Sequence, residues 1–116
     1  MTELHPGDLL IGTYPVATRS VIVAAGADLV RGAVLGKITA TKKYALSASA
    51  AVDGSETPAL ILAVDVLAAG GDVNAVAYGS GEFDSRQLTL GVGHTVESVS
   101  EALSDASAPM FIKTPA

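Results

Sequence analysis

The feature of this sequence that most constrains its fold is a series of short apolar runs separated by glycine-containing turns. The runs are rich in β-branched residues and cover 21–23, 34–38, 43–46, 59–64 and 73–83. Turn signals such as Gly70-Gly71-Asp72 lie between them. Short strands at this spacing are typical of small all-β architectures. The pattern therefore predicts a mostly β domain, shaped as a small barrel or clip.

Three of these runs carry more specific information. Gly36 within 34–38 predicts a place where another stretch of backbone approaches closely. The run 59–64 is almost continuously apolar, which is typical of a strand buried on both faces. The run 73–83 contains Gly79 and Gly81, and we expect one long strand with a glycine-permitted bulge.

One short helix is predicted near 95–104. Thr95 is a candidate N-cap, and Glu97 lies in the first turn, where a carboxylate favours the positive helix end. Apolar residues recur on one helical face; these are Val96, Val99 and Leu103. Pro109 ends the segment. A last short strand is expected at 110–112.

The first 19 residues differ from the rest of the chain. Pro6, Gly7, Gly12 and Pro15 interrupt any regular element around an apolar stretch that starts at Leu9. One interpretation is an edge strand with proline at its margins. The other is an extended N-terminal arm over 1–19 whose apolar residues are buried on a partner, followed by a β-rich domain over 20–116. An isolated arm cannot offset its own ordering entropy.

Hydrophobic residues make up 49% of the 116 residues, yet 20 residues are Ala and only five are Phe or Tyr. The core is therefore built of small side chains. A thin-cored domain of this size often gains stability by forming oligomers or by lying on a partner.

Charge and composition exclude several classes of function. The net charge of −5 argues against a nucleic-acid-binding protein, which needs a basic patch. Uncharged stretches such as 9–18 run ten residues, too short for a transmembrane helix, and the N-terminus does not resemble a signal peptide. The chain has no Cys, so we expect no disulfide and no thiolate chemistry.

No catalytic, cofactor or metal site is predicted. His5 and His94 are far apart in the sequence, and His94 fits a loop residue that packs or hydrogen-bonds near the helix start. No Gly-x-Ser-x-Gly nucleophile motif is present. An enzyme would need Asp65, Asp72, Glu82 and His94 to face one cleft. A binding or structural protein is the favoured interpretation, and the enzyme is kept as an alternative.

Four stretches resemble the head decoration proteins of tailed bacteriophages, the family of the phage lambda capsid-stabilising protein. The first stretch is 25–38. The second is 43–47, followed by the Ser/Ala segment and 53–58. The third combines 59–63 with 65–66, 71–73 and 76–78, and the fourth combines 81–83 with 88–90 and 94–96. In order and spacing they cover most of 20–104. Residues 26–36 also resemble other small β modules of the clip and lipoyl type. The C-terminal end departs from the family pattern, because 104–108 is small and polar and the last strand is delayed to Met110.

The resemblance implies a β-clip-like domain that forms a homotrimer, without catalytic residues or cofactors. Such trimers sit on the outer surface of the expanded head, at three-fold and quasi-three-fold points, and cement the major capsid protein. The protein would be in the host cytoplasm during assembly. The N-terminal arm would become ordered on the shell by strand addition, with capsid contacts from Leu10, Ile11, Tyr14 and Val16. A host-surface or carbohydrate-binding display role stays open as an alternative, although Tyr14, Tyr44 and Tyr78 offer little aromatic surface for it.

Overall fold

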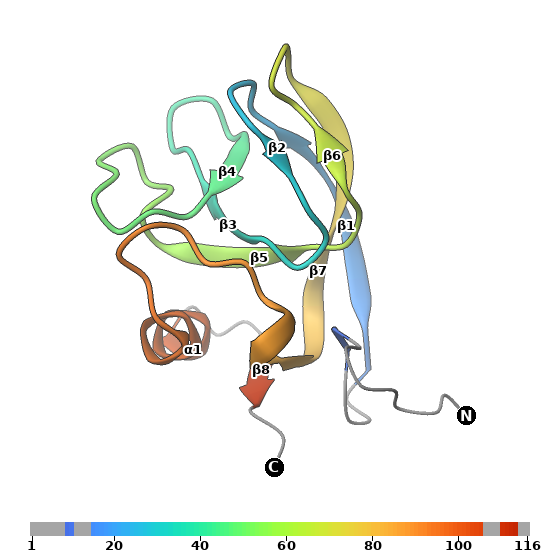
Figure 1. Cartoon of the computed structure of the whole chain (residues 1–116), viewed down its shortest axis with the longest axis vertical. Helices are drawn as coiled ribbons and strands as arrows, with labels where there is room; N and C mark the ends of the chain where they lie inside the picture. The colour runs from blue at the N-terminus through green and yellow to red at the C-terminus, as the bar shows by residue number, and fades with distance from the viewer. Residues whose placement is uncertain (1–8, 11–14, 106–109, 114–116) are drawn as a thin grey trace.

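The computed structural model describes residues 9–10, 15–105 and 110–113 of the chain. Five strands form the wall of a closed barrel in the order β1-β4-β3-β5-β7, and β7 pairs back onto β1 (Figure 1). They are β1 (Ala17–Val23), β3 (Val34–Lys37), β4 (Tyr44–Leu46), β5 (Pro58–Leu62) and β7 (Val73–Asp84). The predicted fold class, a mostly β barrel with one short helix, is confirmed.

The barrel closes along a long antiparallel seam between β1 and β7. The register runs from Ala17 opposite Ser80 to Val23 opposite Val73. It shifts between Ala17 and Thr18, because Thr18 lies opposite Tyr78 and Gly79 is left without a partner. The predicted glycine-permitted bulge in one long strand is therefore confirmed.

A separate two-stranded sheet extends from the seam. β2 (Asp28–Leu29) pairs antiparallel with β6 (Val66–Leu67). Residues 24–27 lead from β1 into β2, and residues 68–72 lead from β6 into β7. We call this pair the β2–β6 ribbon; it continues from the two strands that close the barrel (Figure 1).

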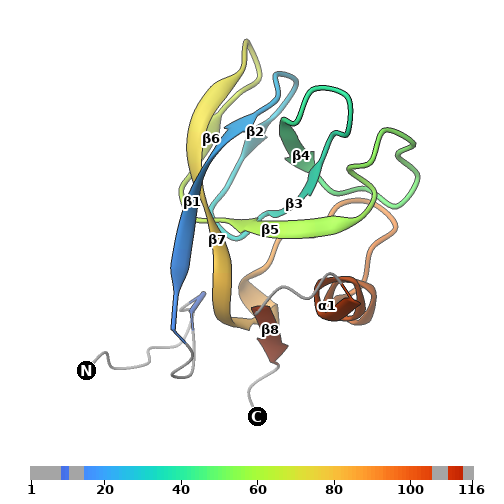
Figure 2. The ribbon, with the colours of Figure 1, turned by 180° about the vertical axis from the view of Figure 1, so that it is seen from behind.

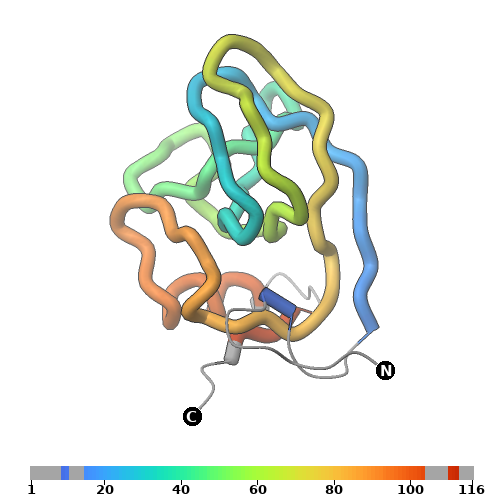
Figure 3. The backbone as a smooth tube through the Cα atoms, turned by 45° about the vertical axis from the view of Figure 1, so that its right-hand side comes forward, coloured from blue at the N-terminus to red at the C-terminus, as the bar shows by residue number. Residues whose placement is uncertain are grey.

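The remaining elements lie at the end of the barrel where β7 finishes (Figures 1 and 3). A 3₁₀ turn, η1 (Ser85–Gln87), follows β7, and α1 (Val96–Asp105) starts after Thr95. The Thr95 hydroxyl accepts from the Ser98 amide at 3.2 Å, so the predicted N-cap is confirmed. β8 (Met110–Lys113) pairs parallel with the end of β7. Pro109, expected to end the helix segment, lies outside the described residues.

The core is made mostly of small and branched apolar side chains, with three buried aromatic rings, Tyr44, Tyr78 and Phe83. Phe83 is the largest fully buried side chain, and α1 contributes Val99 and Leu103. Glycines allow loops to lie directly on the barrel: a Cβ at Gly36 would overlap the Ser55 carbonyl oxygen, and one at Gly91 would overlap that of Ser47. The close backbone approach predicted at Gly36 is therefore confirmed.

Candidate functional site

Two of the four predicted capsid-contact residues meet over one glycine at the end of β7. A Cβ at Gly81 would lie 3.3 Å from Leu10 Cδ2 and 3.4 Å from Val16 Cγ2. Leu10 is half-buried and forms an antiparallel bridge with Phe83, whereas Val16 is 48% exposed. Ile11 and Tyr14 lie outside the described residues.

The chain before β1 is fastened to β7 at two points. The Asp84 amide donates to the Leu9 carbonyl at 2.8 Å. The Ser80 hydroxyl donates to the Pro15 carbonyl at 2.9 Å and accepts from the Ala17 amide at 2.7 Å. Leu9 is buried in the core, and residues 17–19, which sequence reasoning placed in the arm, belong to β1.

Asp84, whose amide bonds to Leu9, also forms an ion pair with Arg86 at the end of β7. The buried Asp84 carboxylate accepts from the Arg86 amide at 2.9 Å and from the Arg86 guanidinium at 3.2 Å. The Arg86 side chain, followed by its backbone amide, holds the pKa of Asp84 below its usual range. The carboxylate also caps η1, so it stays charged and in place at neutral pH.

A groove of about 640 Å³ opens on another side of the barrel. Its lining comes from β1 and β7, and from the end of β3, the β3–β4 turn and β4. Figure 2 shows the course of these strands. Three cationic residues line it, Arg19, Lys37 and Lys42, with no acidic residue among its lining. We call it the cationic groove. Sequence reasoning missed it, because its cations are scattered along a chain of net charge −5.

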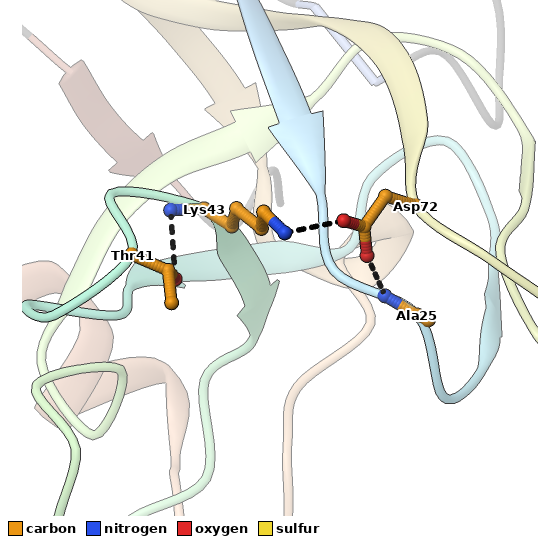
Figure 4. A network of polar contacts seen from close by, with 4 residues as sticks. All are labelled: Ala25, Thr41, Lys43 and Asp72. Carbon is orange, nitrogen blue, oxygen red and sulfur yellow. Dashed lines mark hydrogen bonds and ion pairs between the residues drawn. The ribbon is translucent and has the colours of Figure 1, made fainter.

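Asp72 joins the end of β1 and the start of β4 to the start of β7, three strands that contribute residues to the groove lining (Figure 4). One of its carboxylate oxygens accepts from the Ala25 amide at 2.8 Å, and the other pairs with the Lys43 ammonium group. The Lys43 contact, followed by that from Ala25, lowers the pKa of Asp72. The Lys43 amide in turn lies 3.4 Å from the Thr41 hydroxyl. Lys43 is thus neutralised by a partner, unlike the cations that line the groove.

The residues of the enzyme alternative are engaged with different partners. His94 Nε2 lies 2.9 Å from the Glu56 carbonyl oxygen, and its Nδ1 lies 3.0 Å from the Ser98 hydroxyl. The predicted loop histidine bonded near the helix start is therefore confirmed. Asp65 accepts from the Arg31 amide. Neither His94 nor Asp65 lines the cationic groove.

Within residues 9–10, 15–105 and 110–113, no three His, Cys, Asp or Glu side chains gather where they could hold a metal ion. In the same part of the chain, no helix has both the length and the apolar character that crossing a bilayer requires.

The geometry defines a small closed β barrel with one helix and a groove lined by cationic residues. The family model for bacteriophage lambda head decoration protein D matches residues 1–110 of the chain, and the chain therefore belongs to this family. The family is one of structural phage proteins, and membership implies association with the capsid and a location on the virion. No curated protein matches the sequence.

Proposed function

We propose that this protein is a homotrimeric decoration protein that cements the expanded phage head. It binds the outer surface at three-fold and quasi-three-fold sites between subunits of the major capsid protein and stabilises the shell. The observation that carries the proposal is the family match over residues 1–110. The protein would be present in the host cytoplasm until heads are ready to receive it.

The capsid contact is assigned to the part of the N-terminal arm that precedes β1, through Leu10, Ile11, Tyr14 and Val16. Support comes from Val16, an apolar side chain that is 48% exposed beside the half-buried Leu10. Exposed apolar residues are favoured at docking surfaces, because burying them on a partner removes that area from water. Many identical sites on one shell make a modest contact at each site collectively strong.

The test uses expanded heads that lack this protein, from the phage or prophage that encodes it. Heads are mixed with the wild-type protein or with the variant Tyr14→Ser/Val16→Ser, and bound protein is measured after sedimentation of the heads. Resistance of the heads to heat or chelator-induced rupture is measured in parallel. We expect wild-type protein to saturate the heads and raise their resistance, and the variant to lose at least about ten-fold in affinity.

Val52→Ser is the matched control, because Val52 is 97% exposed and lies in the turn region between β4 and β5. This control should bind as wild type. Wild-type affinity in the Tyr14→Ser/Val16→Ser variant would show that these residues do not contact the shell. Failure of the wild-type protein to bind or protect heads would contradict the cementing function itself.

A further inference from the structure

The cationic groove exists because β1 and β4 pair at only one position. Val23 lies opposite Tyr44 in parallel, while the rest of β1 pairs with β7. No other pairing joins β1 to β4 among the described residues, and the groove is lined by residues of both strands. The contacts of Asp72 with Ala25 and Lys43 tie together the ends of three strands that line it, β1, β4 and β7.

The groove is electrostatically unbalanced. Arg19, Lys37 and Lys42 are exposed, and none of them forms an ion pair with any residue that the structure describes. Three of the seven Lys and Arg residues of an acidic chain therefore line one open volume. Like charges at close quarters repel one another, so this arrangement favours an anionic partner.

Lys42 provides a second observation. Its φ of 64° is in the left-handed region, which glycine adopts at lower cost than a residue with a side chain. The turn itself is closed by the Lys42 amide, which donates to the Ile38 carbonyl at 2.8 Å. A lysine stands where backbone geometry favours glycine, and it places a cation on the groove.

The groove also has an apolar side. Ser20 lies opposite Val76 and Ile22 lies opposite Asn74, so Ile22 and Val76 are diagonal neighbours on one face of the seam. They are 42% and 37% exposed. A partner that fits must therefore combine acidic and apolar groups.

The β2–β6 ribbon of the same chain has that combination. Leu29 and Val66 are buried, and the opposite face carries Asp28 and Leu67, the latter 79% exposed. Val30 and Asp65, just beyond the paired residues, are also exposed. Each carboxylate is held by one backbone amide; Ala69 donates to Asp28 at 3.0 Å, and Arg31 to Asp65 at 2.8 Å.

The nearby cation does not cancel this acidic character on the ribbon face. The Arg31 guanidinium donates to the Tyr78 hydroxyl at 3.2 Å and lies 5.9 Å from the centre of the Tyr78 ring. It is therefore engaged with β7 of its own barrel, and among the described residues it forms no ion pair with Asp28 or Asp65.

We infer that the cationic groove of one copy holds the β2–β6 ribbon of the next copy, an inference that rests on the proposed homotrimer. Arg19, Lys37 and Lys42 would face Asp28 and Asp65, and Ile22 and Val76 would cover Val30 and Leu67. The contact joins two different surfaces, so it is heterologous, the kind of contact from which a closed ring is built. Both surfaces adjoin in each copy, because the ribbon continues from the strands that line the groove.

The experiment measures the oligomeric state of the full chain by sedimentation velocity over a range of protein concentrations, at low and high salt. Lys37→Glu and Leu67→Lys should each raise the concentration needed for half-assembly by at least about ten-fold. The combined variant Lys37→Glu/Leu67→Lys adds a carboxylate to the groove and an ammonium group to the ribbon face, beside Asp28. These new opposite charges attract each other, so the variant should recover part of that loss. Raising salt should weaken the wild-type trimer.

Lys42→Gly separates assembly from folding, since glycine accepts the left-handed backbone. This variant should keep the wild-type thermal midpoint, measured where both proteins are monomeric, and still assemble more weakly. Val52→Lys is the matched control for Leu67→Lys, because it also replaces an exposed apolar residue with a cation; it should assemble as wild type.

The outcomes separate this inference from the proposed function. A wild-type trimer that Lys37→Glu and Leu67→Lys leave intact overturns the inference, and so does a combined variant without recovery. If these variants assemble normally but no longer bind heads, the groove receives an acidic segment of the capsid protein instead of a second copy. A wild-type protein that is monomeric at every concentration overturns the inference, and head binding then decides the cementing function separately.

Discussion

The backbone amide of Asp84 donates a hydrogen bond to the carbonyl of Leu9, 2.8 Å away. The contact joins the end of the longest strand to the segment before the first strand. It places the Leu9 side chain in the core, beside the half-buried Leu10. The N-terminal segment is therefore part of what stabilises the barrel, in addition to any role in docking.

The first prediction concerns Leu9. Leu9→Ala should lower the free energy of unfolding by about 2–5 kcal/mol, because it leaves a cavity among buried side chains. Urea unfolding at matched protein concentrations measures this, since assembly also affects apparent stability. Val52→Ala is the control and should change the free energy by less than about 0.5 kcal/mol. A stability of Leu9→Ala equal to that of the control would contradict the burial of Leu9.

Leu9 also bears on how the arm is tested. A deletion of residues 1–18 removes Leu9 from the core and the start of β1, so loss of head binding would not separate docking from folding. Substitutions at Tyr14 and Val16 are a cleaner test, because they leave the core residue Leu9 and all of β1 in the chain.

The second prediction concerns Gly81. Its φ is 138°, and a Cβ would press on Leu10, Val16 and Phe83 at 3.3–3.4 Å. Gly81→Ala should destabilise the protein by at least about 1 kcal/mol, because alanine adopts this backbone only with strain. Gly70→Ala is the matched control: nothing lies within 4 Å of its added Cβ, so thermal unfolding should occur at the wild-type temperature or higher. Equal loss in both variants would show that the effect is not local to Gly81.

The third prediction concerns acid. The pKa values of Asp84 and Asp72 are lowered in the folded state by Arg86 and Lys43. A carboxyl group whose pKa is lower when folded stabilises the protein above its unfolded pKa, and this contribution disappears as pH falls through the folded value. Stability should therefore be maintained at neutral pH and decline below about pH 4, near the ordinary carboxyl pKa.

Urea unfolding between pH 7 and pH 2 measures this decline. Asp84→Asn removes one titrating group, and Arg86→Gln removes its cationic partner, so both variants should lose less stability on acidification than the wild type. The same decline in all three proteins would mean that the Asp84–Arg86 pair does not contribute to acid sensitivity.

The fourth prediction concerns His94. The Glu56 carbonyl can only accept, so the hydrogen on His94 Nε2 is donated to it and connects the β4–β5 loop to the start of α1. His94→Ala should cost about 1–3 kcal/mol by leaving that acceptor unpaired. Hydrogen exchange measured by mass spectrometry should show faster exchange over 47–57 and 95–99, and an unchanged rate over the β1–β7 seam. Uniformly faster exchange would instead indicate global destabilisation.

Much of the barrel was predictable from local sequence patterns. The continuous apolar run at 59–64 predicted the buried strand β5, and the Thr95 cap and the spacing of Val99 and Leu103 predicted α1. These signals are local, since they depend on residues a few positions apart. Gly79 likewise marked the bulge because a strand interior rarely places a glycine there without a structural reason.

Long-range features were not predictable in the same way. β2 and β6 have two residues each, too few for any periodicity, and only their pairing makes the ribbon. Arg19 lies in β1 and Lys42 lies in the turn between β3 and β4. Only the pairing of β1 with β4 and β7 in the folded barrel brings both residues to one groove. Leu9 falls between residues that break regular structure, so nothing in the pattern distinguishes a core residue from an exposed one.

The seam that closes the barrel has a consequence for how the protein is made. Ala17 and Ser80 are 63 positions apart, so the barrel cannot close until nearly all of β7 has left the ribosome. Pairings across such distances in sequence are slow to form. Translation products that stop before β7 therefore lack a folded barrel and leave the β1 edge open to aggregation. Only chains extended past this strand enter the pool of folded protein.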